Sequence, residues 1–134
     1  MTASIPTGWK IQESESQKPG YVESKWTDPH DTAAYLLIDE SPATHLTPAE
    51  DAAPVHADTE RTRGYREVYY GTGDLASVDS WMWIFELPAA ERIDYFFERC
   101  SDTFGVLGSA SPEDFRQLRP ALRAFAQSVH SVCR

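Results

Sequence analysis

The stretch Trp81-Met82-Trp83-Ile84-Phe85-Glu86-Leu87 decides the fold of this chain. Successive side chains of a strand point to opposite faces of a sheet, so its three aromatic residues share one face while Met82 and Ile84 share the other. A strand that is apolar on both faces is typical of the centre of a sheet that is covered on both sides. We expect this strand to run from Ser77 to Leu87.

A second aromatic strand is predicted from Glu91 to Cys100, after the short connection Pro88-Ala89-Ala90. Three of its apolar residues, Ile93, Tyr95 and Phe97, alternate along the chain and therefore share one face. A connection this short joins antiparallel neighbours, so the two strands are predicted to form a hairpin.

The sequence Thr47-Pro48-Ala49-Glu50 is a clear signal for the N-terminus of the first helix. This pattern is a capping box, in which the Thr47 hydroxyl accepts from the third helical amide and the Glu50 carboxylate accepts from the Thr47 amide. Proline also suits the first helical position. We expect a helix from about Pro48 to Arg61, although Pro54 should kink it or delay its start.

The last helix repeats this start chemistry at Ser111-Pro112-Glu113-Asp114. The signal predicts a helix from Ser111 to Val132, with a short first turn or a bend at Pro120. Its buried stripe, at alternating spacings of three and four, is Phe115, Leu118, Leu122, Phe125, Val129 and Val132.

The remaining strands complete the prediction of fold class. The order is strands, helix, strands, helix, with tight hairpins in the second half, which favours antiparallel pairing. We therefore predict a single α/β (α+β) domain over residues 1–134, with a twisted, mainly antiparallel sheet of six or seven strands flanked by helices. The other expected strands are residues 2–5, 9–12, 21–26, 33–38, 65–70 and 103–109.

Composition excludes some classes of function. The chain has 134 residues, 41% of them hydrophobic, and a net charge of −9. Phosphate binding needs clustered Lys and Arg, so no nucleic-acid partner is expected. Without an apolar run of about 20 residues, no membrane span is expected either. The opening Met-Thr-Ala-Ser has no basic or apolar region, so we expect no signal peptide in the chain.

Two cysteines, Cys100 and Cys133, indicate a possible disulfide. A pair of cysteines in a small domain forms a bridge if the compartment is oxidising. The alternative is two unrelated buried thiols. Neither cysteine belongs to a CxxC pattern, so zinc and redox catalysis are not expected.

The whole pattern resembles a known family, the PsbP-like proteins. That family includes an accessory subunit of the plant photosystem, a nuclear-import factor that binds the GTPase Ran, and actinobacterial LpqN-type lipoproteins. A similar module follows the membrane span of some actinobacterial serine/threonine kinases. The matching segments are Ile5-Pro6-Thr7-Gly8-Trp9, Asp28-Pro29, Trp81 to Glu86, Arg92 to Phe97, and the closing helix.

The resemblance implies a fold and a setting rather than a reaction. Its extracytoplasmic bacterial branch fits best and implies a non-enzymatic binding or sensor module of a lipoprotein or membrane kinase, which contacts a protein or a small ligand. The alternative is a carrier that holds an apolar ligand between sheet and helices, lined by residues such as Trp83, Phe85 and Phe97. No cofactor is expected.

Aromatic residues are the best candidates for binding, because they exceed what a small core needs. If several are exposed together they would form a contact patch, with the loop from Ser41 to Pro54 as its rim. The candidate patch residues are Trp26, Tyr69, Tyr70, Trp81 and Trp83.

Two polar clusters could hold a metal ion. His56 and Glu60 are four apart on the first helix and share a face, but a site needs further ligands, so we favour a solvated surface pair. The turn with Asp28, His30 and Asp31 lacks a calcium-loop pattern, and turn chemistry explains these residues. We predict no metal site.

Catalytic arrangements are equally weak in the sequence. Glu86, Glu91 and Asp94 lie near one hairpin and could form an acid/base pair, but charged residues at strand ends usually face water. Two other sets have no supporting motif: the serines Ser101, Ser109 and Ser111 with His130, and the glycines of Gly71-x-Gly73. We predict no catalytic residue.

Overall fold

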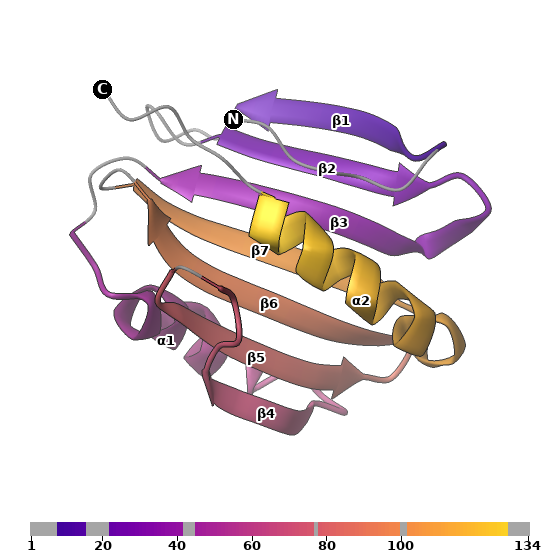
Figure 1. Cartoon of the computed structure of the whole chain (residues 1–134). Helices are drawn as coiled ribbons and strands as arrows, with labels where there is room; N and C mark the ends of the chain where they lie inside the picture. The colour runs from indigo at the N-terminus through magenta and orange to yellow at the C-terminus, as the bar shows by residue number, and fades with distance from the viewer. Residues whose placement is uncertain (1–7, 16–21, 42–44, 77, 100–101, 129–134) are drawn as a thin grey trace.

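The computed structural model describes residues 8–15, 22–41, 45–76, 78–99 and 102–128. They form a seven-stranded sheet and two helices (Figure 1). The elements are β1 (Lys10–Glu15), β2 (Val22–Asp28), β3 (Asp31–Ser41), α1 (Pro48–Thr59), β4 (Arg66–Thr72), β5 (Ser80–Leu87), β6 (Ala90–Arg99), β7 (Asp102–Ala110) and α2 (Pro112–Ser128).

All neighbouring strands pair antiparallel, in the order β1-β2-β3-β7-β6-β5-β4. This confirms the predicted α+β class and sheet type. The sheet consists of two meanders, β1 to β3 and β4 to β7. They are joined by the pairing of β3 with β7, which runs from Tyr35 opposite Ser109 to Ser41 opposite Thr103.

The two helices cover opposite faces of the sheet, with α2 in front and α1 behind in Figure 1. The predicted alternation of β5 explains this arrangement. Met82 and Ile84 belong to the cluster under α2, whereas Trp83 and Phe85 belong to the cluster under α1. β5 is therefore apolar on both faces because both are covered.

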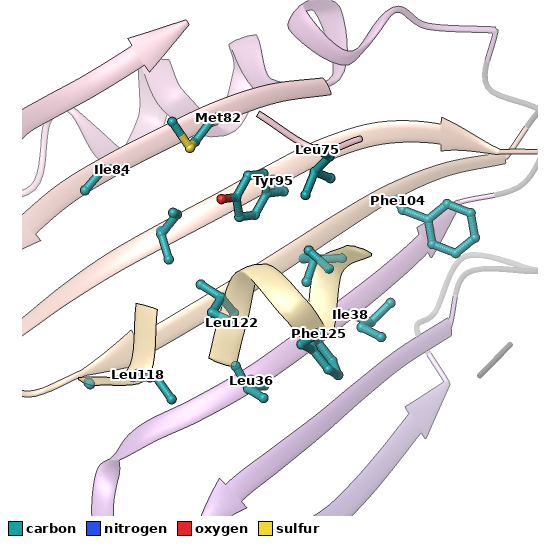
Figure 2. Close-up of a cluster of buried hydrophobic side chains, with 14 of the residues drawn as sticks. Leu36, Ile38, Leu75, Met82, Ile84, Tyr95, Phe104, Leu118, Leu122 and Phe125 are labelled. Carbon is teal, nitrogen blue, oxygen red and sulfur yellow. The ribbon is translucent and has the colours of Figure 1, made fainter. Parts of the chain in front are cut away.

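The larger core lies under α2. Figure 2 shows Leu118, Leu122 and Phe125 of this helix over the strand residues Leu36 and Ile38. The stripe predicted from the sequence is confirmed for the four positions described, while Val129 and Val132 lie outside the described residues. The helix also continues through Pro120, which removes one main-chain donor from its middle.

The start of α1 is the predicted capping box. The Glu50 amide donates to Thr47 Oγ1 at 3.2 Å, and the Thr47 amide donates to Glu50 Oε1 at 3.1 Å. The helix begins at Pro48 and includes Pro54, so the expectation of a delayed start was wrong. The capping box stabilises the first turn of the helix, and Pro54 lies in the second turn, so it does not prevent the helix from starting at Pro48.

The boundaries of the described strands differ from the predictions by up to three residues, as in β3, which runs from Asp31 to Ser41 where residues 33–38 were expected. β5 begins at Ser80 rather than Ser77, after a turn in which the Gly73 amide donates to the Ser80 carbonyl at 2.8 Å. The expected strand over residues 2–5 and the position of Ser77 lie outside the described residues.

Candidate functional site

A polar pocket of about 260 Å³ lies on the α1 side of the sheet, by which we mean the face that α1 covers. It is lined by residues of three strands and one helix, and we call it the acidic pocket because it contains three carboxylates. Its lining residues are Asp39 and Ser41 of β3, Asp51 and Val55 of α1, Asp94 and Phe96 of β6, and Thr103 and Gly105 of β7.

Strand register brings these residues together. Gly105 of β7 pairs with Asp39 on one side and with Phe96 on the other. Asp94 lies two residues before Phe96, so its side chain points to the same face. Asp51 enters from the first turn of α1.

Gly105 leaves the floor of the pocket open. A Cβ atom added there would meet nothing nearer than Asp39 at 3.8 Å and Phe96 at 3.9 Å. An alanine would therefore fit, whereas a longer side chain would occupy the pocket.

Asp94 is the unusual group of the acidic pocket. Its Oδ1 atom is buried and has no hydrogen-bond partner among the described residues. Burial, and then the charges of Asp39 and Asp51, raise the pKa of the Asp94 carboxyl well above its usual value, with Arg92 opposing them. Burial also raises the pKa of Asp51. The pocket therefore favours a protonated, neutral Asp94 when it is empty of positive charge.

The three carboxylates do not converge on one point. Among the described residues, no group of three or more His, Cys, Asp or Glu side chains is arranged to hold a metal ion.

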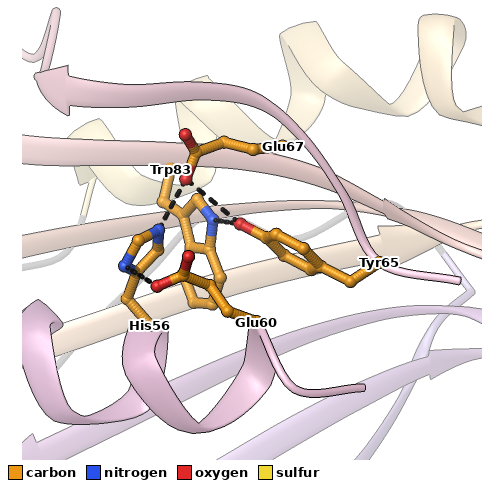
Figure 3. A network of polar contacts seen from close by, with 5 residues as sticks. All are labelled: His56, Glu60, Tyr65, Glu67 and Trp83. Carbon is orange, nitrogen blue, oxygen red and sulfur yellow. Dashed lines mark hydrogen bonds and ion pairs between the residues drawn. The ribbon is translucent and has the colours of Figure 1, made fainter. Parts of the chain in front are cut away.

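A second polar arrangement, which we call the His56 network, joins α1 to β4 and β5 (Figure 3). His56 Nδ1 lies 3.1 Å from Glu60 Oε1, and its Nε2 lies 2.5 Å from Glu67 Oε1. The Tyr65 hydroxyl donates to Glu67 at 3.2 Å and accepts from Trp83 Nε1 at 3.0 Å. The network satisfies the buried indole and fixes the C-terminal half of α1 on the sheet.

His56 differs from the sequence interpretation. The expected solvated pair with Glu60 was wrong for the His56 side chain, which is only 15% exposed. Its ring stacks on Tyr70 with centroids 3.7 Å apart. The signal that was missed is Glu67 of β4, which the turn after α1 brings back beside His56.

The candidate contact residues are divided between three places. Tyr70, Trp81 and Trp83 lie together on the α1 side, where Tyr70 is 5.3 Å from Trp81 between ring centroids. Trp83 is buried there, with 1% of its surface exposed. Trp26 lies elsewhere: it packs on Phe125 under α2 and is 8% exposed.

Tyr69 is 40% exposed and pairs with Ile84, whose side chain points to the α2 side. The structure thus brings three of the five aromatic residues together.

The hairpin carboxylates are separated by the structure. Glu86 accepts two hydrogen bonds from Arg66, at 2.7 and 2.6 Å, and this contact lowers the pKa of Glu86. Glu86 pairs with Glu91 near the turn, as expected for strand ends. Asp94 instead lies in the acidic pocket, so the expectation that it faces water was wrong. It lies in mid-strand, on the face that also carries Phe96.

Other candidates have structural roles. The His30 amide donates to Asp28 Oδ1 at 2.9 Å, as in an ordinary turn, beside an open pocket of about 420 Å³ that Asp31 also lines. Ser111 donates to Asp114 at 3.1 Å, which agrees with its predicted place at the helix start.

The other serine, histidine and glycine candidates are described only in part. Ser109 is buried, and Ser101 and His130 lie outside the described residues. Gly71 and Gly73 belong to the end of β4 and its turn.

Two further expectations concern the cysteines and the membrane. Cys100 and Cys133 both lie outside the described residues, so the disulfide stays a prediction. In the described part of the chain, no helix has the length and apolar character that crossing a membrane requires.

Comparison with known proteins places the fold. No protein-family model matches the sequence, and no curated protein matches it significantly. Solved structures do match. The cyanobacterial PsbP protein (CyanoP) of Synechocystis sp. PCC 6803 aligns with a TM-score of 0.70 at 11% identity, over 96% of this chain and 84% of that one.

Two other bacterial structures are similar. LpqN of Mycobacterium tuberculosis, described as involved in cell envelope biogenesis, aligns with a TM-score of 0.61 at 12% identity, over 92% of this chain and 78% of LpqN. A Pseudomonas aeruginosa protein of unknown function, described as a putative regulator, aligns with a TM-score of 0.56 at 13% identity, over 96% and 89%. The chain therefore has the PsbP-like fold.

Proposed function

We propose that this chain is a non-enzymatic binding module that contacts a small ligand or a protein segment through the α1 side of its sheet. The acidic pocket carries this proposal, because a buried carboxyl oxygen without a partner is costly unless something pairs with it. The pocket lies between α1 and the sheet, with the exposed Val55 of α1 at its rim and the buried Phe96 of β6 as one wall.

The non-enzymatic part of the proposal is supported by what the catalytic candidates do. Glu86 is held by Arg66, and Ser111 bonds within the first turn of α2. Asp94 lies apart from both, and the only nucleophiles among the described lining residues of its pocket are the hydroxyls of Ser41 and Thr103. This arrangement suits binding more than acid/base catalysis.

The setting that we propose is extracytoplasmic, in a lipoprotein or the sensor part of a membrane kinase. Its support is the similarity of fold to LpqN, which is described as involved in cell envelope biogenesis. A disulfide between Cys100 and Cys133 would agree with such a compartment.

The alternative, a carrier of an apolar ligand between sheet and helices, has less support. Its proposed lining residues lie on opposite sides of the sheet, with Phe97 under α2 and Trp83 and Phe85 under α1. Phe97 stacks on Phe104 at 5.4 Å, and Trp83 stacks on Phe85 at 4.1 Å. These contacts fill the space that an apolar ligand would need.

The test is a fragment screen by NMR on the whole chain, with two variants at one position. Fragments of positive, neutral and negative charge should include some that shift the amide signals of Val55, Phe96 and Gly105. Gly105→Leu should abolish these shifts because it fills the pocket, and Gly105→Ala should retain them. If no fragment shifts these signals, or if the leucine variant binds equally well, the proposal is wrong.

A further inference from the structure

We propose that the acidic pocket binds a compact organic cation, such as an alkyl mono- or diammonium compound, with Asp94 as its central acceptor. This inference rests on the proposed function, since it names the class of ligand for the same pocket. Four steps lead to it: charge, spacing, wall chemistry and proton balance.

Charge is the first step. Among the described residues, the lining of the acidic pocket contains three carboxylates and no Lys, Arg or His. Arg92, two residues before Asp94 on the same face of β6, is the cation whose charge acts on Asp94, and its guanidinium lies 5.9 Å from the Tyr35 ring centre. The pocket therefore attracts positive charge that the protein itself does not supply in its lining.

Spacing is the second step. The carboxylates come from β3, α1 and β6, and in the described part of the chain they are not grouped as metal ligands. An elongated ammonium compound can direct its N–H donors toward two carboxylates that are not arranged around one metal position.

Wall chemistry is the third step. Phe96 and Val55 give the pocket an apolar side, and the Phe96 ring can interact with a cation or pack on a short carbon chain. The volume of about 260 Å³ lies below that of most drug-sized pockets. The ligand is therefore a compound with a few carbon atoms.

Proton balance is the fourth step. The groups that face Asp94 are Asp39 from β3, Asp51 from α1, and Arg92 on its own strand. An ammonium group beside Asp94 stabilises the ionised carboxylate, so binding expels the proton that the empty pocket favours. Affinity should therefore rise with pH until Asp94 is already ionised in the free protein.

The experiment is isothermal titration calorimetry on the full chain with two probes of equal length. We expect 1,4-diaminobutane to bind, and the uncharged 1,4-butanediol to give no measurable heat. Measured between pH 5.5 and 8.5 in two buffers of different ionisation enthalpy, the diamine should release protons, and its affinity should rise with pH.

Three variants test which carboxylates bind the diamine. Asp94→Asn should weaken diamine binding by about tenfold or more and remove the proton release, since it deletes a charged acceptor. Asp51→Asn should weaken it several-fold. Asp58→Asn, which removes the same charge from an exposed position of the same helix, should leave it unchanged.

The outcomes separate the two proposals. Equal binding of diol and diamine, or unchanged affinity in both Asp94→Asn and Asp51→Asn, overturns the cation inference. If only neutral or anionic fragments bind, and Gly105→Leu abolishes their binding, the proposed function stands and the cation class is wrong. The proton measurement on the unaltered chain decides the matter even if Asp94→Asn does not fold.

Discussion

Asp94 is a residue whose burial destabilises the fold but supplies the acidic pocket with a binding group. It lies in the middle of β6 between the buried Ile93 and Tyr95, but on the opposite face, beside Phe96. Alternation in the sequence places Asp94 on the face that also carries Trp83 of the neighbouring strand. An acid there is expensive, because the charged form loses its water.

The stability of the fold should depend on pH through Asp94. Its pKa is higher in the folded than in the unfolded chain, so the folded protein binds the proton more tightly, and stability falls as pH rises from about 4 through the folded pKa. Asp94→Asn should therefore be more stable than the unaltered chain at pH 8, by about 1 kcal/mol, and should lose this advantage toward pH 4.

Urea unfolding at several pH values measures this difference. Asp58→Asn, on the exposed side of α1, is the control for removal of a negative charge. A stability difference between Asp94→Asn and the unaltered chain that does not change with pH would contradict the prediction.

Tyr65 gives a second prediction at the residue scale. Burial raises its pKa to about 12, with the hydrogen bond from Trp83 opposing this shift, so the phenol keeps its proton at neutral pH and can donate to Glu67. Tyr65→Phe leaves the Trp83 indole N–H without its acceptor and should lower the free energy of unfolding by about 1–3 kcal/mol.

The control is Tyr69→Phe, which removes an exposed hydroxyl that donates to the Thr72 carbonyl at 2.7 Å. It should change the free energy of unfolding by less than about 0.5 kcal/mol. Urea unfolding followed by tryptophan fluorescence reports both variants, and equal losses would argue against the His56 network as a stabilising contact.

Sequence reasoning at the residue scale was limited by contacts between distant elements. The capping role of Thr47 could be predicted because its partner, Glu50, is three residues away. The role of His56 could not, since Glu67 lies on the next strand and its position depends on the turn after α1. Asp94 was considered, but its burial depends on α1, which packs over β6 from far away in sequence.

At the scale of elements, two glycines of β7 have different reasons to be glycine. A Cβ on Gly108 would lie 2.4 Å from both methyl groups of Leu122, which is fully buried in α2. The close approach of α2 to β7 thus requires the absence of a side chain at Gly108. Gly105, on the other face, has room for a methyl group.

Gly108→Ala should therefore destabilise the fold by about 1–3 kcal/mol, since Leu122 or the helix must move. Gly105→Ala, in the same strand, should cost less than about 0.5 kcal/mol. Thermal unfolding of the pair is the measurement. Similar melting temperatures would show that α2 adapts without cost and would refute the role given to Gly108.

Elements were predicted best where their signal is local. The aromatic strand β5, although it was expected to begin at Ser77, and both helix starts follow from alternation and capping within a few residues. The order of strands could not be predicted in this way, because the pairing of β3 with β7 joins segments separated by α1 and three strands. The resemblance to PsbP-like proteins implied the fold as a whole, but no strand order was predicted from it.

At the scale of the whole molecule, the fold is shared while the identities are low, at 11–13%. Such a likeness carries the arrangement of sheet and helices, and function depends on the site that each chain builds on it. The acidic pocket is built from side chains of four elements of this chain, so it is the feature to compare with other members of the fold.

The predicted disulfide belongs to this scale, because Cys100 follows β6 and Cys133 follows α2. In protein purified without reductant and then denatured, a thiol reagent should detect no free thiol. Cys100→Ser and Cys133→Ser should each expose one thiol and lower stability by roughly 2–4 kcal/mol. Two free thiols in the unaltered oxidised protein would refute the bridge and remove support for an oxidising compartment.

The pairing of β3 with β7 also has a consequence for synthesis on the ribosome. β1 to β3 leave the exit tunnel first and can form their meander, yet the free edge of β3, with Leu36 and Ile38 on it, has no neighbour until β7 has emerged. Non-local pairings of this kind fold slowly and leave strand edges open to other chains. The nascent chain is therefore most vulnerable to misassembly between the emergence of β3 and the emergence of β7, and a chaperone that holds an extended apolar strand would have its greatest effect in that interval.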